Sequence, residues 1–308
     1  MIGTMLSNQS ELEELRRRID GIDNNLLDLL ADRLEVVSRV AALKANGGGA
    51  TYVPSREAAI IRRLVERRRG DLPVGTMIRL WRELLGAAVR LEGPFAVGAF
   101  VPTDGPGVWD ISRDHFGSHV PMTMFQTSLQ VIRAVTDRRV AVGVLPVPQD
   151  GDVDPWWVHL LSSDIEVPRV IARLPFGPRG NARYDGDALA IGYAPQAASG
   201  GADRTLIATE NAVDISHSRF ATAFTSLGLT CRLIASSRQG NTLIELEGFV
   251  TLDDPRLAQL RERFAGDLLR LLPVGSYPVP LPEASSPAVT STMAPPLAMS
   301  AAAQGTRG

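Results

Sequence analysis

Apolar residues recur every three or four positions between residues 12 and 43, which is the spacing of one long amphipathic helix. The stripe consists of Leu12, Leu15, Ile19, Ile22, Leu26, Leu29, Arg33, Val36, Val40 and Leu43, so nine of its ten positions are apolar and the tenth is Arg33. A neighbouring stripe also carries Arg16 and Lys44. Cations on a face suited to burial are costly unless an anion meets them. The alternative is that Arg16 and Lys44 extend to water and Arg33 pairs with a nearby acid.

The ends of this helix also have sequence signals. Ser10 and Glu13 have the spacing of a capping box, which predicts that the helix begins at Ser10. Asn46 and Gly47 predict its end. At 1.5 Å per residue such a helix is about 50 Å long. It cannot bury its apolar face within one small chain, so we expect a helical dimer or a bundle partner.

Two further helices are predicted before residue 94. Ser55 is expected to cap a helix over residues 56–69, and a third helix runs over 75–92 until Gly93 and Pro94 end it. Their inner faces are Ile60, Ile61, Leu64 and Val65 on the second helix, and Ile78, Trp81, Leu84, Leu85, Ala88 and Val89 on the third. Residues 1–94 are therefore predicted to be an all-α domain of three helices.

After residue 94 the pattern changes to short β-like segments that alternate with helices. Strands are expected at 95–101, 140–147, 170–174 and 188–193, and helices at 109–116, 127–136 and 154–161. From residue 205 the expected order is strand (205–209), helix (216–227), strand (230–236), strand (242–250) and helix (254–271). Residues 274–308 are rich in Pro, Ala and Ser, so we expect a disordered tail. The chain is predicted to be multidomain, with boundaries 1–94, 95–200, 201–273 and 274–308.

Composition excludes several classes of function. The chain has 308 residues, a net charge of −2, one cysteine (Cys231) and four histidines. This charge does not favour nucleic acid or an anionic membrane as a partner. No metal-ligand spacing is present, and the acidic residues 150–154 indicate a turn. Without a signal pattern or an apolar run of about eighteen residues, the protein is expected to be soluble and cytoplasmic, with no cofactor and no metal.

Several charged residues of the helical region stand in a recognisable register. The pattern is Leu-Arg-x-x-Ile-Asp-x-Ile-Asp from residue 15, Leu-Leu-x-x-Arg ending at Arg33, Val-x-x-x-Lys ending at Lys44, Pro-x-Arg-Glu ending at Glu57, and Leu-Trp-Arg-Glu-Leu from residue 80. It resembles the all-α class of chorismate mutases and covers nearly all of residues 11–94.

The resemblance implies an intertwined homodimer that converts chorismate to prephenate in phenylalanine and tyrosine biosynthesis. Arg16, supplied by the other protomer, and Arg33 would hold the substrate carboxylates, and Lys44 would donate to a carboxylate and to the ether oxygen. Arg56 would support the site, and Glu57 would accept from the ring hydroxyl. The reaction is an intramolecular rearrangement, so positioning and charge stabilisation suffice without a nucleophile or a metal.

Three positions depart from the family pattern. Val53 stands where the family commonly has Asp, and Ala88 and Glu92 stand where it has Ser and Gln. Losing a hydrogen bond to a charged group costs about 1.5–3 kcal/mol, or one to two decades in rate. An ionised Glu92 has only acceptors, so it would need a proton to donate to the ether oxygen. We therefore expect turnover to fall as pH rises, unless Glu92 simply faces water at the helix end.

The C-terminal half resembles known domains less closely. The segment WDISRDHFG, followed by AVGVLPVPQD, is similar to the first lobe of a prephenate dehydratase domain, with a second lobe missing. The Thr-Arg-Phe segment of that family would fall at Gly186, Asp187 and Ala188, so no dehydratase activity is expected. Residues 201–273 resemble an ACT-type regulatory domain. Two other functions remain open: isochorismate-pyruvate lyase, and a non-catalytic sensor of aromatic amino acids.

Overall fold

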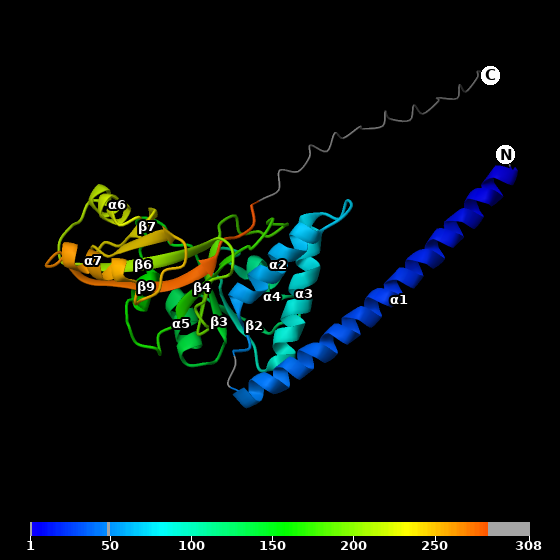
Figure 1. Cartoon of the computed structure of the whole chain (residues 1–308), viewed down its shortest axis with the longest axis horizontal. Coiled ribbons are helices and arrows are strands. Elements are labelled where there is room, and N and C mark those ends of the chain that lie inside the picture. Colours follow the sequence, from blue (N-terminus) through cyan, green and yellow to red (C-terminus); the bar gives the residue numbers. More distant parts are fainter. Residues whose placement is uncertain (1, 48–49, 283–308) are drawn as a thin grey trace, which may run out of the picture.

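The first helix is longer than expected. In the computed structural model of the chain, which describes residues 2–47 and 50–282, helix α1 spans Ile2–Gly47. It projects away from the rest of the molecule, and its C-terminal end lies beside α3 (Figure 1). The predicted start at Ser10 is wrong. Residues 2–9 contain no proline, so nothing in the sequence stops the helix from continuing upstream of Ser10.

Helices α2 (Pro54–Arg67) and α3 (Val74–Glu92) complete the helical region. The predicted Ser55 cap is also wrong: Val53 is the N-cap residue and makes no side-chain cap. Pro54 takes the first helical position instead, where its missing N–H costs nothing. The two helices share a buried apolar cluster that consists of Ala58, Ile61, Met77, Ile78 and Leu85, together with Phe176 from the following region.

The rest of the described chain is built on one nine-stranded sheet with the strand order β2-β1-β3-β5-β4-β9-β6-β8-β7. The strands are β1 (Val97–Phe100), β2 (Met122–Phe125), β3 (Val142–Pro146), β4 (Arg169–Leu174), β5 (Ala188–Gly192), β6 (Asp203–Asn211), β7 (Cys231–Ser236), β8 (Thr242–Glu247) and β9 (Leu268–Pro278). The helices are α4 (Trp109–Phe116), α5 (Ser128–Thr136), the 3-10 turn η1 (Trp156–Leu160), α6 (His217–Ser226) and α7 (Pro255–Arg263). The chain is therefore helical up to residue 92 and α/β beyond it.

Strand β9 joins the two halves of this sheet. It pairs antiparallel with β6 along most of its length and meets β4 in parallel at Val170 and Gly275. A Cβ on Gly275 would lie 2.1 Å from the Val170 carbonyl oxygen, so glycine is required for this approach. The helix expected over 254–271 is wrong beyond residue 263, and the disordered tail expected from residue 274 is wrong up to residue 278, because β9 continues to Pro278. Residues 283–308 of that tail lie outside the described residues.

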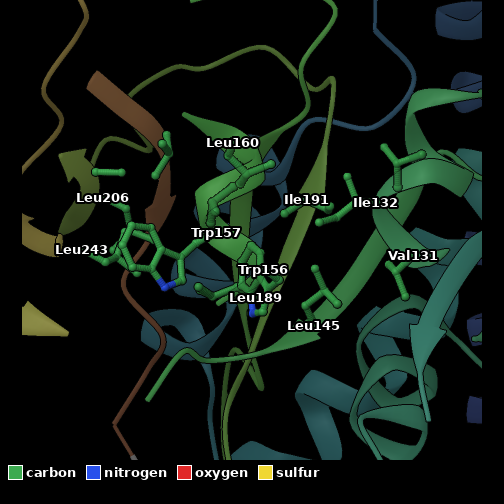
Figure 2. Close-up of a cluster of buried hydrophobic side chains, with 14 of the residues drawn as sticks. Val131, Ile132, Leu145, Trp156, Trp157, Leu160, Leu189, Ile191, Leu206 and Leu243 are labelled. Carbon is green, nitrogen blue, oxygen red and sulfur yellow. The ribbon is translucent and has the colours of Figure 1, made fainter. Parts of the chain in front are cut away.

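Both faces of the sheet are covered. Helix α4 packs on Val97, Ala99, Val142 and Val144, whereas α6 and α7 cover Ile207, Ile244 and Leu271 of the second half. On the other face, Trp156 and Trp157 of η1 lie in one buried cluster with Leu189 and Ile191 from the first half and Leu206 and Leu243 from the second (Figure 2). The cluster therefore spans both halves of the sheet.

Two predicted elements differ in kind from the observed ones. Residues 122–125 were not expected to form a strand, and their half-exposed position on the edge strand β2 gives them no strong apolar pattern. The helix expected over 154–161 is the short 3-10 turn η1. None of the helices in the described ranges is both long and apolar enough to cross a membrane.

Candidate functional site

The C-terminal half of α1 presents one partly covered face toward α3. Its half-buried positions recur at helical spacing and are Leu30, Arg33, Leu34, Val37, Ala41 and Lys44. The nine apolar members of the predicted stripe are instead exposed, by 39% to 74%. Within one chain, the face that holds Arg33 and Lys44 is therefore partly covered, while most of the apolar surface of α1 is exposed.

Arg33 lacks a complete set of partners. Its Nη1 atom is buried and, among the described residues, makes no hydrogen bond. The expected alternative, in which Arg33 pairs with a nearby acid, finds no support, since no ion pair of Arg33 occurs in the described part of the chain. A buried donor without an acceptor is costly, which suits a position that an anionic ligand would complete.

Lys44 reaches across to the end of α3. Its Nζ atom donates to Glu92 Oε2 over 2.6 Å, and the Glu92 side chain is only 11% exposed. The alternative in which Glu92 faces water is therefore wrong, as is the one in which Lys44 simply extends to solvent. The pair links α1 to α3 beside the buried Ala88.

Glu57 lies buried at the start of α2 and is bound by a residue that the sequence analysis did not single out. Arg82 of α3, only 3% exposed, donates from Nη1 to Glu57 Oε2 over 2.7 Å. The Glu57 pKa is raised, mainly because the side chain is buried. The charge and hydrogen bond of Arg82 act to lower it, and the negative charge of Glu92 acts to raise it. Arg82 could have been found by the same signal as Arg33, since it interrupts the apolar stripe of Ile78, Leu85 and Val89.

A second buried pair, Tyr52 and His115, lies near Glu57. The Tyr52 hydroxyl is 3.5 Å from His115 Nε2, and both residues are buried. Burial raises the Tyr52 pKa well above its usual value, and the negative charge of Glu57 raises it further. The positive charge of Arg82 acts in the opposite direction. Burial lowers the His115 pKa well below its usual value, and the positive charge of Arg82 lowers it further. His115 belongs to α4, so this buried group connects the helical region to the α/β region.

The other predicted site residues lie apart from this group. Arg16 and Arg56 are both exposed. Arg16 precedes Lys44 by 28 positions on the same straight helix, which is a separation of about 42 Å. One chain therefore brings together Lys44, Glu92 and the Glu57–Arg82 pair, with Arg33 on the same face of α1 as Lys44, but it cannot bring Arg16 to them.

Comparison with known proteins identifies the class of this three-helix N-terminal domain. Residues 15–93 match the family model described as chorismate mutase type II. The chain therefore carries a chorismate mutase domain of this type at its N-terminus.

Similar curated proteins extend the match beyond this domain. A bifunctional chorismate mutase/prephenate dehydratase of Pseudomonas aeruginosa is 32% identical over 173 residues, which cover 54% of this chain and 46% of that protein. The T-protein of Enterobacter agglomerans is 41% identical over 81 residues, covering 26% of this chain and 21% of that protein. The first alignment is more than twice as long as the mutase match, so it reaches into the α/β region. The chain spans about half the length of the bifunctional relatives it matches.

A solved prephenate dehydratase from Streptococcus mutans aligns with 60% of this chain and 98% of its own, at 13% identity and a TM-score of 0.40. Similarity at this level carries no weight for the function of the α/β region.

Proposed function

We propose that this protein is a chorismate mutase, which rearranges chorismate to prephenate in the biosynthesis of phenylalanine and tyrosine. The observation that carries the proposal is the buried Nη1 of Arg33, which has no hydrogen-bond partner among the described residues and lies on the α1 face that also holds Lys44. A substrate carboxylate would satisfy that donor, and the forked guanidinium would fix its orientation. With the single cysteine Cys231 as a free thiol, the enzyme would suit the reducing cytoplasm.

The remaining groups suit a reaction that needs positioning and charge stabilisation. Lys44 would donate to a carboxylate and to the ether oxygen, where negative charge grows as the C–O bond breaks. Glu57, held in place by Arg82, would accept from the ring hydroxyl. Arg56 would support the site from the outside of α2, and the buried Ala88 would line it.

The proposed enzyme is an intertwined homodimer in which Arg16 acts in trans. The separation of about 42 Å between Arg16 and Lys44 leaves a second chain as the source of this arginine. The apolar stripe of α1, exposed in one chain, supplies the surface that the partner helix would bury.

The decisive test follows chorismate absorbance and prephenate formation with purified full-length protein. Arg33→Ala should lower turnover at least about a hundredfold, because it removes charge-assisted hydrogen bonds to the substrate, while circular dichroism and light scattering still report a folded dimer. Arg39→Ala is the matched control, since Arg39 lies on the same helix in an exposed pair with Glu35. Wild-type turnover in Arg33→Ala would refute the assignment of the site.

Other products would identify the alternatives. Consumption of isochorismate alone, with release of pyruvate and salicylate, would make the protein a lyase. No turnover of either substrate, combined with binding of an aromatic amino acid, would make it a sensor.

We further infer that the α/β region has no prephenate dehydratase activity. Where the resemblance places Thr-Arg-Phe, this chain has Gly186, Asp187 and Ala188. Asp187 is occupied by ion pairs with Arg173 and Arg179, both at 2.8 Å, and Ala188 is buried in β5. Incubation with prephenate at neutral pH should yield phenylpyruvate only at the uncatalysed rate, and faster formation would overturn this inference.

A further inference from the structure

A cavity of about 670 Å³ lies where the helical region meets the α/β region. Its walls come from the segment before α2, the C-terminal end of α3, and the segments next to β1, β3 and β5. They include Tyr52, Arg90, Phe95, Arg138, Arg139 and Tyr193. None of the proposed mutase site residues lines it. Its volume falls within the range of small-molecule sites.

The charge of this cavity has one sign. Three arginines, Arg90, Arg138 and Arg139, line it, and no acidic residue of the described chain does. The acids near Arg138 and Arg139 are only weakly placed: Glu166 is 3.4 Å from Arg138 and Asp137 is 3.6 Å from Arg139, in pairs that are more than half exposed. Such pairs neutralise little. The cavity therefore combines a positive potential with apolar and aromatic wall residues.

Arg138 has an unusual backbone position. It follows the last residues of α5 with a φ of 58°, the left-handed conformation that helix ends usually give to glycine. Hydrogen bonds from Arg138 N to Val135 O and from Arg139 N to Ala134 O hold this turn. The guanidinium lies 3.4 Å from the centre of the Tyr193 ring, which orients it. Strain of this kind concentrates at functional positions.

We propose that this cavity binds a small organic anion, a carboxylate carried on an aromatic or apolar body. Arg138 and Arg139, which both line the cavity, supply forked guanidinium donors for the carboxylate oxygens. Arg90, from α3, adds a third cation, and Phe95 and Ile171 contact the apolar body. The site is separate from the proposed mutase site and does not depend on it.

The test uses 3-phenylpropanoate as the probe and isothermal titration calorimetry on the full chain. One saturable site is expected, and 3-phenylpropanamide, which has the same shape without the charge, should bind at least about tenfold more weakly. Arg138→Gly removes the guanidinium and leaves a residue that prefers this backbone conformation, so the variant should fold. Combined with Arg139→Ser, it should weaken binding at least about tenfold.

Two controls separate this site from others. Arg133→Ser changes an exposed arginine of α5 that does not line the cavity, and Arg33→Ala changes the proposed mutase site; both should keep wild-type affinity. Loss of binding in Arg33→Ala but not in the double variant would place the probe in the mutase site and overturn the proposal. So would equal affinity for acid and amide, or no saturation up to about 10 mM.

Discussion

Lys44 Nζ on α1 lies 2.6 Å from Glu92 Oε2 at the end of α3. The contact joins the C-terminal turns of two helices whose other ends diverge (Figure 1). It also commits to a carboxylate the ammonium group that the proposed mechanism needs for the substrate. Binding of a dianion would therefore have to compete with Glu92 for Lys44.

Replacing Glu92 by Gln should raise turnover at alkaline pH. The amide releases Lys44 from its partner and offers an N–H donor where the ionised carboxylate offers only acceptors. We therefore expect Glu92→Gln to turn over chorismate faster than the wild type at pH 8. Identical pH–rate profiles for the two proteins would show that Glu92 does not contact the developing charge.

Two inactive variants should restore one another if Arg16 acts in trans. When Arg16→Ala and Arg33→Ala chains are mixed in equal amounts and re-equilibrated, half of the dimers are heterodimers. Each heterodimer has two sites, of which one is intact. Activity should therefore recover to about a quarter of wild type, measured as chorismate loss. Activity that stays at the level of the single variants, with heterodimers confirmed by mass spectrometry, would mean that both arginines act in the same chain.

Gly86 marks where α3 touches the α/β region. A Cβ on this residue would lie 2.1 Å from the Phe116 carbonyl oxygen, so Gly86→Ala must separate α3 from α4. Such overpacking costs about 1–3 kcal/mol, against a gain of about 1 kcal/mol in helix propensity. We expect a net loss in the free energy of unfolding, measured with urea. Gly21→Ala is the matched control: a Cβ there meets nothing within 4 Å in one chain, so it should stabilise α1.

His115 should make the fold sensitive to acid. Burial, then the Arg82 charge, hold its pKa well below 6.5 in the folded state, so only the unfolded state takes up this proton near pH 6.5. The unfolded state then binds more protons, and stability must fall as pH drops below 6.5, by up to about 1.4 kcal/mol per pH unit.

Urea unfolding between about pH 5 and pH 7 measures this effect. In His115→Gln, the free energy of unfolding should lose the part of its pH dependence that one proton contributes. His119→Gln, which changes an exposed neighbour, should keep the wild-type slope. If the free energy of unfolding depended on pH in the same way for wild type and His115→Gln, the assignment of a neutral, buried imidazole would be wrong.

How much of the site was accessible from the sequence depends on the residue. Arg33 and Lys44 could be singled out because each breaks an apolar helical stripe, which periodicity alone reveals. Arg82 carries the same signal but was missed, since its partner Glu57 lies 25 positions away on another helix. The element types were largely predictable for the same reason, whereas the start of α1 and the short edge strand β2 have no strong local pattern.

The sequence by itself determined the three helices, the alternation of strands and helices after residue 94, and the chorismate mutase register, because these depend on spacing along the chain. Only the tertiary structure decided that Glu92 is covered and paired with Lys44, that β9 joins both halves into one sheet through Gly275, and that Arg90 shares a cavity with Arg138 and Arg139 from a distant segment. Burial, ion pairing and close backbone approach are relations between segments far apart in sequence, and no local pattern encodes which segments meet.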